Sequence, residues 1–130
     1  MRAVKRKCAG IALALVATLA SSGCGVVSST TVSDAPGKSL EFVEDRLQPD
    51  VTLLIQDVSP RVGLAASYGL GDDGLWTVVA LCADSAVLDN ATSVEVAVVP
   101  QRAVDVAVRN LIRDGAFRAA VDCDGRDYAA

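Results

Sequence analysis

The stretch LWTVVALC, residues 75–82, decides the fold because it holds the only Trp in 130 residues and one of four cysteines. Its Trp, Thr and Val residues favour a β-strand, and glycines before it and Asp and Asn residues after it mark turns. Simple alternation divides it into two faces, Trp76, Val78, Ala80 and Cys82 on one and Leu75, Thr77, Val79 and Leu81 on the other. Because both sets are largely apolar, we expect a central strand with both faces covered, a helix on one side and Trp76 as a core anchor.

A partner for this strand is expected at residues 93–99, SVEVAVV, where apolar and other side chains alternate and Glu95 should lie outside. The inward positions are Val94, Val96 and Val98. The connection 83–92 is too short for a crossover helix of ordinary length, so this strand should pair with 75–82 in antiparallel fashion.

The region before the Trp strand holds a further strand candidate and a long loop. Residues 51–58, VTLLIQDV, favour a strand, and residues 62–70 are compatible with another short one. Residues 69–74, GLGDDG, fit the letters of a dinucleotide-binding fingerprint, but a strand follows where a helix is needed. Asp72 and Asp73 would also repel phosphate, so we expect a hairpin loop.

Two short helices flank these strands. Ser39 is suited to cap a helix over residues 39–47, which Pro49 would end, and the apolar stripe of this helix is Leu40, Val43 and Leu47. Residues 102–113 predict a second helix with Gly115 as its C-terminal cap. Its apolar positions at helical spacing are Val104, Val108 and Leu111.

The N-terminal end is typical of an exported protein, with basic residues followed by an apolar run that is too short to span a bilayer. Residues 19–24, LASSGC, resemble a bacterial lipobox, in which cleavage occurs just before a lipidated cysteine. Ser21 departs from that pattern, since Leu is usual there, and plain secretion stays an alternative. We expect residues 1–23 to be a signal peptide, Cys24 to be lipidated, and residues 24–35 to contain a flexible Ser/Thr-rich tether.

The cysteines indicate one disulfide. Cys8 leaves with the signal peptide, and lipidation of Cys24 leaves Cys82 and Cys123 as a pair. A bond between them in an oxidising compartment closes 123 − 82 = 41 residues and contributes about 3–4 kcal/mol. Residues 116–121 are expected to be an extended segment that delivers Cys123 to the Trp strand.

Charge argues against nucleic acid as a partner. From residue 24 onward the chain has 12 − 4 = 8 basic and 16 acidic side chains, a net charge of −8. Such a surface repels phosphate backbones and anionic lipid heads.

The chemistry of the side chains argues against catalysis. The chain has no His, which removes His-based triads and most zinc sites. Glu44 and Asp45 are adjacent and point in different directions on a helix, so they form no acid/base pair. Residues 122–127, DCDGRD, lack the spaced ligands of a calcium loop and are expected to be a solvated turn. We therefore expect no catalytic residue, metal or cofactor.

From about residue 33 to residue 99 the chain resembles a PASTA domain. The matching residues are Gly37, Ser39, Leu40, Val43 and Leu47, then Trp76 and Val78, then Val94, Val96 and Val98. The resemblance implies an α+β fold over residues 36–99, with a short helix packed on a small antiparallel sheet. Residues 100–130 have no counterpart and are expected to add a C-terminal helix and a disulfide-tethered tail.

The resemblance also implies a role at the cell wall, because PASTA domains are associated with muropeptide sensing, although no ligand residue of the family has a match here. The expected function is a non-catalytic lipoprotein on the outer face of the cell membrane that binds peptidoglycan fragments. The alternative is a secreted protein-binding module, an inhibitor or a subunit of an envelope complex, that has no glycan affinity and uses a sheet edge or the 102–113 helix.

Overall fold

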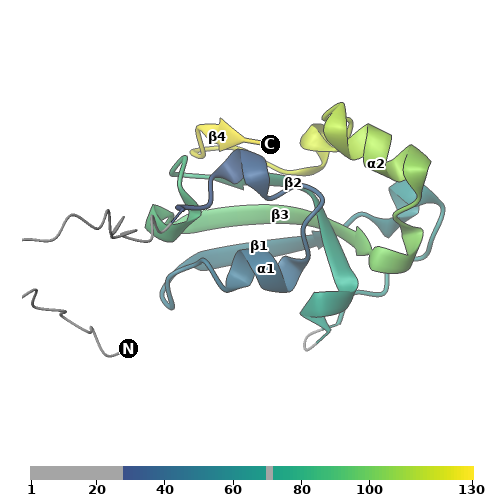
Figure 1. The fold of residues 1–130 in the computed structure, drawn as a ribbon, viewed down its shortest axis with the longest axis horizontal. Helices are drawn as coiled ribbons and strands as arrows, with labels where there is room; N and C mark the ends of the chain where they lie inside the picture. Colours follow the sequence, from purple (N-terminus) through teal and green to yellow (C-terminus); the bar gives the residue numbers. More distant parts are fainter. Residues whose placement is uncertain (1–27, 70–71) are drawn as a thin grey trace, which may run out of the picture.

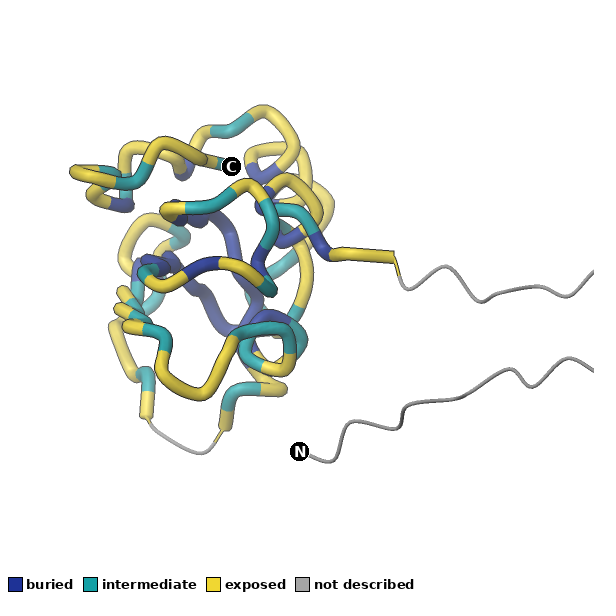
Figure 2. Tube along the Cα trace, turned by 90° about the vertical axis from the view of Figure 1, so that its left-hand side faces the viewer, coloured by how far each residue is buried: buried dark blue, intermediate teal, exposed yellow. Residues whose placement is uncertain are grey.

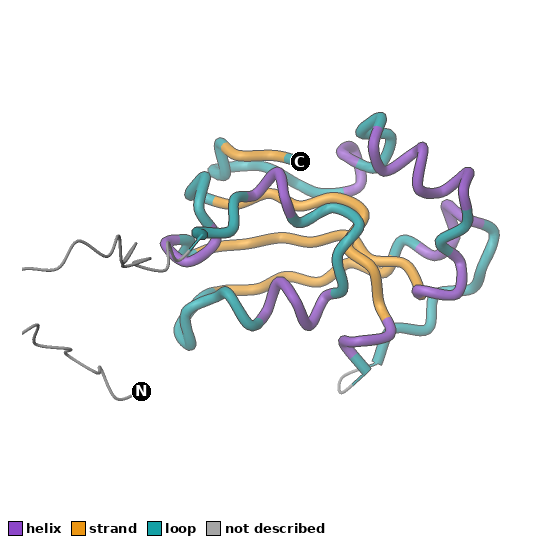
Figure 3. The backbone as a smooth tube through the Cα atoms, viewed as in Figure 1, coloured by secondary structure: helices purple, strands orange, loops and turns teal. Residues whose placement is uncertain are grey.

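The computed structural model describes residues 28–69 and 72–130, which form one four-stranded sheet with a helix on each side (Figure 1). The strands are β1 (Thr52–Asp57), β2 (Trp76–Ala83), β3 (Ser93–Pro100) and β4 (Tyr128–Ala129), in the sheet order β1-β3-β2-β4. The α-helices are α1 (Leu40–Glu44) and α2 (Val106–Arg113), and short 3-10 turns lie between the elements (Figure 3). The expected α+β class, with one sheet, two helices and a disulfide, is confirmed.

The sheet is mixed. β2 and β3 pair antiparallel, as predicted, but β1 pairs with β3 in parallel. β1 and β2 are consecutive in the chain but not neighbours in the sheet, because the long connection between them leaves the place beside β1 to β3. The hairpin expected at residues 69–74 is therefore wrong, and the 3-10 turn Asp73–Leu75 leads into β2 instead. Residues 62–69 form no strand.

β2 is the central strand that the sequence predicts, and all 8 of its residues are buried. Its two faces, however, do not follow simple alternation. Val78 pairs with Val98 and Ala80 pairs with Ala97, so Val79 is an extra residue, a β-bulge. Beyond the bulge the faces exchange, and Cys82 lies on the face opposite to Trp76, contrary to the prediction.

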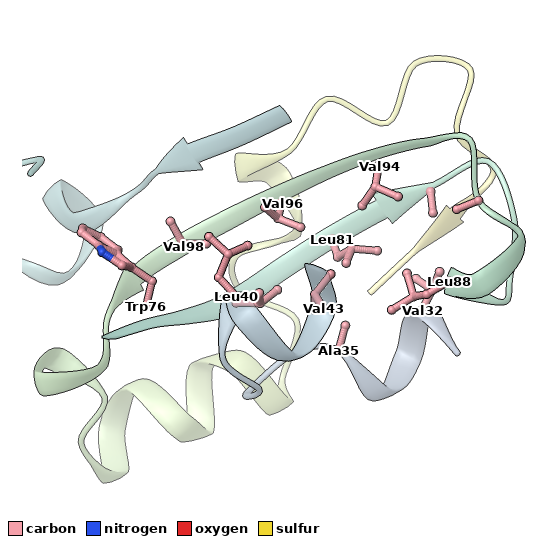
Figure 4. Packing of buried hydrophobic residues seen from close by; sticks show 13 residues of the cluster. Val32, Ala35, Leu40, Val43, Trp76, Leu81, Leu88, Val94, Val96 and Val98 are labelled. Atoms are coloured by element: carbon pink, nitrogen blue, oxygen red, sulfur yellow. The ribbon is translucent and has the colours of Figure 1, made fainter. Parts of the chain in front are cut away.

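The face that carries Trp76 packs against α1 (Figure 4). α1 begins as predicted at the cap Ser39, whose Oγ accepts a hydrogen bond from the backbone N–H of Phe42 at 3.1 Å. Leu40 and Val43 of α1 are fully buried against the sheet. The strand residues in this layer include Trp76, Val78, Leu81, Val94, Val96 and Val98. Figure 2 shows the buried parts of the chain gathered inside the fold, with exposed residues on the surrounding loops.

The opposite face packs against α2 and the segment that follows it. α2 begins at Val106 instead of residue 102 because Asp105 caps it, accepting a hydrogen bond from the N–H of Val108 at 2.8 Å. Its buried side chains are Val108 and Ile112, whereas Leu111 is 43% exposed, so the predicted apolar stripe is rotated. Gly115, with φ of 73°, ends the helix as predicted.

The segment before α1 belongs to the fold from about residue 30, which corrects the expected tether over 24–35. Val32 is 4% exposed and Ala35 is fully buried. The N–H of Val32 donates to the carbonyl of Ala86 at 2.9 Å, which fastens this segment beside the turn after β2. The signal peptide, Cys24 and the start of the tether lie outside the described residues.

The tail after α2 covers the sheet and is held by covalent and polar links. The predicted disulfide between Cys82 and Cys123 is present. Residues 116–121 are not extended, because the 3-10 turn Arg118–Ala120 lies within them. Glu95, expected outside, is only 2% exposed, because the tail lies over it and Arg126 pairs with it at 3.2 Å.

Candidate functional site

A cleft of about 710 Å³ lies beside the outer edge of β2, between the chain that leads into α1 and the helix α2. Gly37 and Lys38 hydrogen-bond to Val78 at one end of this edge, and Ala130 hydrogen-bonds to Leu81 at the other. The lining residues are Ser33, Pro36, Gly37, Thr77, Gln101, Val104, Arg109, Ile112, Arg113, Gly115, Arg118 and Ala130. We call this the arginine cleft, because three of its lining residues are arginines.

The helix α2 and its C-terminal cap position these arginines. Arg109 and Arg113 are four residues apart on α2 and thus share one face of the helix. Arg118 lies after the turn at Gly115, and a Cβ atom built on Gly115 would lie 3.2 Å from its Nε atom. Glycine at this position therefore both permits the left-handed backbone and leaves room for the Arg118 guanidinium.

The arginines of the cleft are weakly neutralised by the rest of the described chain. Arg109 donates to the carbonyl of Val104 at 3.3 Å, and Arg113 lies 3.6 Å from Asp114 in an exposed pair, which is worth little. None of the 16 acidic side chains of the sequence is among the lining residues. The cleft is thus a positive site on a negatively charged domain.

Two arginines outside the cleft, Arg46 and Arg126, have structural partners. Arg46 stacks on the ring of Phe42, with its Cζ atom 3.7 Å from the ring centre, and also donates to Thr30. Arg126 donates to Glu95 and to Ser93. These contacts distinguish Arg46 and Arg126 from the arginines that line the cleft. Arg61 and Arg102 line a smaller hollow, whose lining includes an acidic side chain, Asp105.

The groups that line the cleft suit binding better than catalysis. Arginine offers paired N–H donors that match carboxylate and phosphate oxygens, and it does not act as a general base at neutral pH. The hydroxyls of Ser33 and Thr77 are the nucleophile candidates in the lining, and no His or acidic side chain there would activate them. Val104 and Ile112 add an apolar patch to the same wall.

A second polar cluster lies at the contact of α1 with the turn before β2. The hydroxyl of Tyr68 donates to Asp73 at 2.8 Å, and its ring packs edge-on against Trp76 with ring centres 5.2 Å apart. Burial, followed by the nearby charge of Asp73, raises the pKa of Glu44 to about 7. Burial and the bond to Asp73 also raise the pKa of Tyr68. Trp76 is 6% exposed, in agreement with its predicted role as a core anchor.

The cysteines predicted from the sequence as site residues do not belong to the lining of the cleft. The Cys82–Cys123 disulfide fastens the tail that brings Ala130 to the rim of the cleft. Cys24 lies outside the described residues. The arginines themselves were not predicted as a site, although the spacing of Arg109 and Arg113 on a predicted helix was a signal for one shared positive face.

The described residues and the comparisons with known proteins add no further site or relative. Within residues 28–69 and 72–130, no set of three or more His, Cys, Asp or Glu side chains is placed to hold a metal ion. No helix in this part of the chain combines the length and apolar character needed to cross a membrane. No family model, no curated protein and no solved structure matches the chain.

Proposed function

We propose that this protein is a non-catalytic lipoprotein of the outer face of the cell membrane, and that its arginine cleft binds carboxylate-bearing cell-wall material such as peptidoglycan fragments. One observation carries the ligand half of this proposal. Three arginines and no acidic side chain line a cleft of about 710 Å³, in a domain whose net charge from residue 24 onward is 8 − 16 = −8.

The cleft has the chemistry to select such a ligand. The stem peptides of peptidoglycan carry free carboxylates, and each guanidinium can hold one of them through two parallel hydrogen bonds. The apolar side chains of Val104 and Ile112 lie beside the arginines and suit the methyl and methylene groups of a peptide stem. The surrounding negative charge disfavours large polyanions such as nucleic acid, so a short ligand fits better.

The placement at the membrane is supported by the sequence. The lipobox-like residues ending in Cys24 favour acylation, and the Cys82–Cys123 disulfide favours an oxidising compartment. The resemblance of residues 33–99 to PASTA domains supports a wall-directed role. The intact mass of protein taken from membranes tests the anchor. We expect a mass that includes two acyl chains or more on Cys24 and that is lower by two hydrogen atoms because of the disulfide between Cys82 and Cys123. An unmodified Cys24 would favour secretion.

The ligand is tested by pull-down with purified peptidoglycan and by titration with soluble muropeptides. We expect the double variant R109Q/R113Q to lose affinity by about tenfold or more, since each charge-assisted bond contributes about 1.5–3 kcal/mol. The matched control is R61Q/R102Q, which makes the same change of net charge at arginines outside the cleft. Equal losses in both variants would contradict a cleft-specific site. Wild-type binding no better than that of an unrelated acidic domain would refute the wall ligand.

A second candidate, a secreted protein-binding module without glycan affinity, is favoured by the exposed apolar side chains of α2. Val106 is 66% exposed and Leu111 is 43% exposed, and Leu111 lines a smaller hollow of about 320 Å³ together with Val62. Chemical crosslinking in the envelope followed by mass spectrometry tests it. A partner protein crosslinked through α2, with no muropeptide binding, would favour this function over the first.

A further inference from the structure

Among the described residues, only β3 lies beside β1, so β1 leaves one edge of the sheet open. The N–H of Thr52 donates to the carbonyl of Thr92, just before β3, at 2.9 Å, and the N–H of Val58 donates to the carbonyl of Val98 in β3 at 3.0 Å. Since the direction of backbone polar groups alternates along a strand, the N–H and C=O groups of Leu53 and Ile55 point away from the sheet. The outer edge of β2 differs, because residues 37–39 and 128–130 cover much of it.

This open edge lacks the features that usually keep sheet edges apart. Residues 51–56, VTLLIQ, contain no charged residue, proline or glycine. The pairing of β1 with β3 runs without a bulge, so the edge is regular along its whole length. Leu54 on this strand is 49% exposed. Such an edge is a ready template for another strand.

We propose that the occupant is β1 of a second copy of this chain, paired antiparallel across a two-fold axis at Leu54, so that two four-stranded sheets join into one. In this register Leu53 of each copy lies opposite Ile55 of the other. These are the residues whose N–H and C=O groups point outward. In each pair the N–H of either residue donates to the C=O of the other. The two Leu54 side chains meet at the axis, in a pair whose Cα atoms are ~4.5 Å apart.

Charge favours a second copy as the occupant. The domain is strongly acidic, and along residues 51–56 two copies can approach with no like charges directly opposite. Asp57, at the end of the strand, is turned into its own molecule, because its carboxylate accepts hydrogen bonds from the N–H groups of Ser59, Ser67 and Tyr68. The neutral stretch is therefore bounded at one end by a charge that is already satisfied, and at the other by the exposed Asp50, which in this register lies opposite the apolar Val58 of the second copy.

The proposed axis is perpendicular to the sheet, which gives the dimer two useful properties. Each apolar layer continues into the same layer of the partner copy, because residues directly opposite each other point to the same face. The arginine cleft lies on the β2 side of each copy, and β1 is at the other edge. Both clefts therefore stay open, at the two outer ends of the joined sheet.

Charge substitution at the axis tests the dimer. Sedimentation equilibrium of the full chain should give twice the monomer mass for the wild type, and the monomer mass for Leu54→Lys and for Leu54→Glu, because like charges would meet. An equimolar mixture of these two variants should recover the dimer. The matched control is Val106→Lys, on the 66% exposed Val106 of α2, which should remain dimeric. A wild type that stays monomeric up to about 1 mM (a standard-state binding free energy weaker than about −4 kcal/mol) overturns the proposal.

Crosslinking tests the register. With Cys8 and Cys24 replaced by Ser, Leu54→Cys should form an intermolecular disulfide under mild oxidation, because the two positions face each other. Thr52→Cys, on the same face of the same strand, should not, because the two Thr52 positions are four residues apart along the strands, about 13 Å. Crosslinking of Thr52→Cys in preference to Leu54→Cys overturns this pairing. If the chain is monomeric and an extended peptide binds along β1, the proposed dimer is overturned and the edge takes a strand from another protein.

Discussion

Removal of Arg126 should cost this fold more stability than removal of any exposed arginine. The carboxylate of Glu95 is 2% exposed, and the guanidinium of Arg126 lies 3.2 Å from its Oε2 atom. Its Oε1 atom accepts hydrogen bonds from the side chain of Gln56 and from the N–H of Asp122, the latter at 3.0 Å. Arg126 also donates to Ser93 at 3.0 Å, so it ties the tail to the start of β3.

The substitution Arg126→Met leaves the charge of Glu95 buried without its counterion. Breaking a buried ion pair from one side typically costs about 3–5 kcal/mol. Because Gln56 and the N–H of Asp122 still donate to Oε1, we expect the lower end of that range, about 3 kcal/mol. This is a large share of the 5–15 kcal/mol (roughly) that holds a small domain together.

Urea unfolding measures this cost, with fluorescence of the only Trp, Trp76, as the signal, since it is buried in the fold. The control Arg113→Met removes an exposed pair and should change stability by less than about 0.5 kcal/mol. A double-mutant cycle of Glu95→Ala and Arg126→Ala should give a coupling of about 2 kcal/mol. Additive single effects, or a cost of Arg126→Met below about 1 kcal/mol, would refute the reasoning.

Three further changes test other links in the fold. Replacement of both Cys82 and Cys123 by Ala should lower the free energy of unfolding by about 3–4 kcal/mol, measured by urea unfolding without reductant, because the bond closes a separation of 41 residues. Asp105→Ala removes the cap of α2 and should cost about 1 kcal/mol in the same assay, whereas Asp105→Asn should cost much less. The pKa of Glu44 is raised from its ordinary value of 4.5 to about 7 in the fold. The contribution of this protonated carboxyl to the free energy of unfolding is therefore fully present below pH 4.5 and is lost as the pH rises through about 7. Glu44→Gln should therefore flatten the fall in stability over this pH range, seen in thermal unfolding at a series of pH values, and an unchanged slope would contradict the assignment.

Features set by local sequence were predictable. Ser39 caps α1 and Gly115 ends α2, because both roles depend on the residue itself and its near neighbours. The antiparallel pairing of β2 with β3 followed from the short connection between them. The disulfide followed from the count of cysteines in an exported chain.

Features set by contacts far apart in the sequence were not predictable. Alternation placed Glu95 outside, because nothing near it shows that Arg126 and the tail will cover it. The parallel pairing of β1 depends on the path of a long loop, which leaves no periodic signal. The arginine cleft needs residues around Gly37, the helix α2 and Ala130 to meet, and only the arginine spacing on α2 was visible beforehand.

The extra residue at Val79 has a consequence for insertions and deletions in this strand. Loss of Val79 would remove the bulge and restore strict alternation, and Cys82, then five positions from Trp76 along the strand, would stay on the face opposite to it. Loss of Leu81, which lies beyond the bulge, would instead turn the sulfur atom of Cys82 toward the α1 layer, away from its bonding partner. A single codon deleted at the bulge should thus keep the covalent link, whereas one deleted two codons further on should remove it while both cysteines are retained.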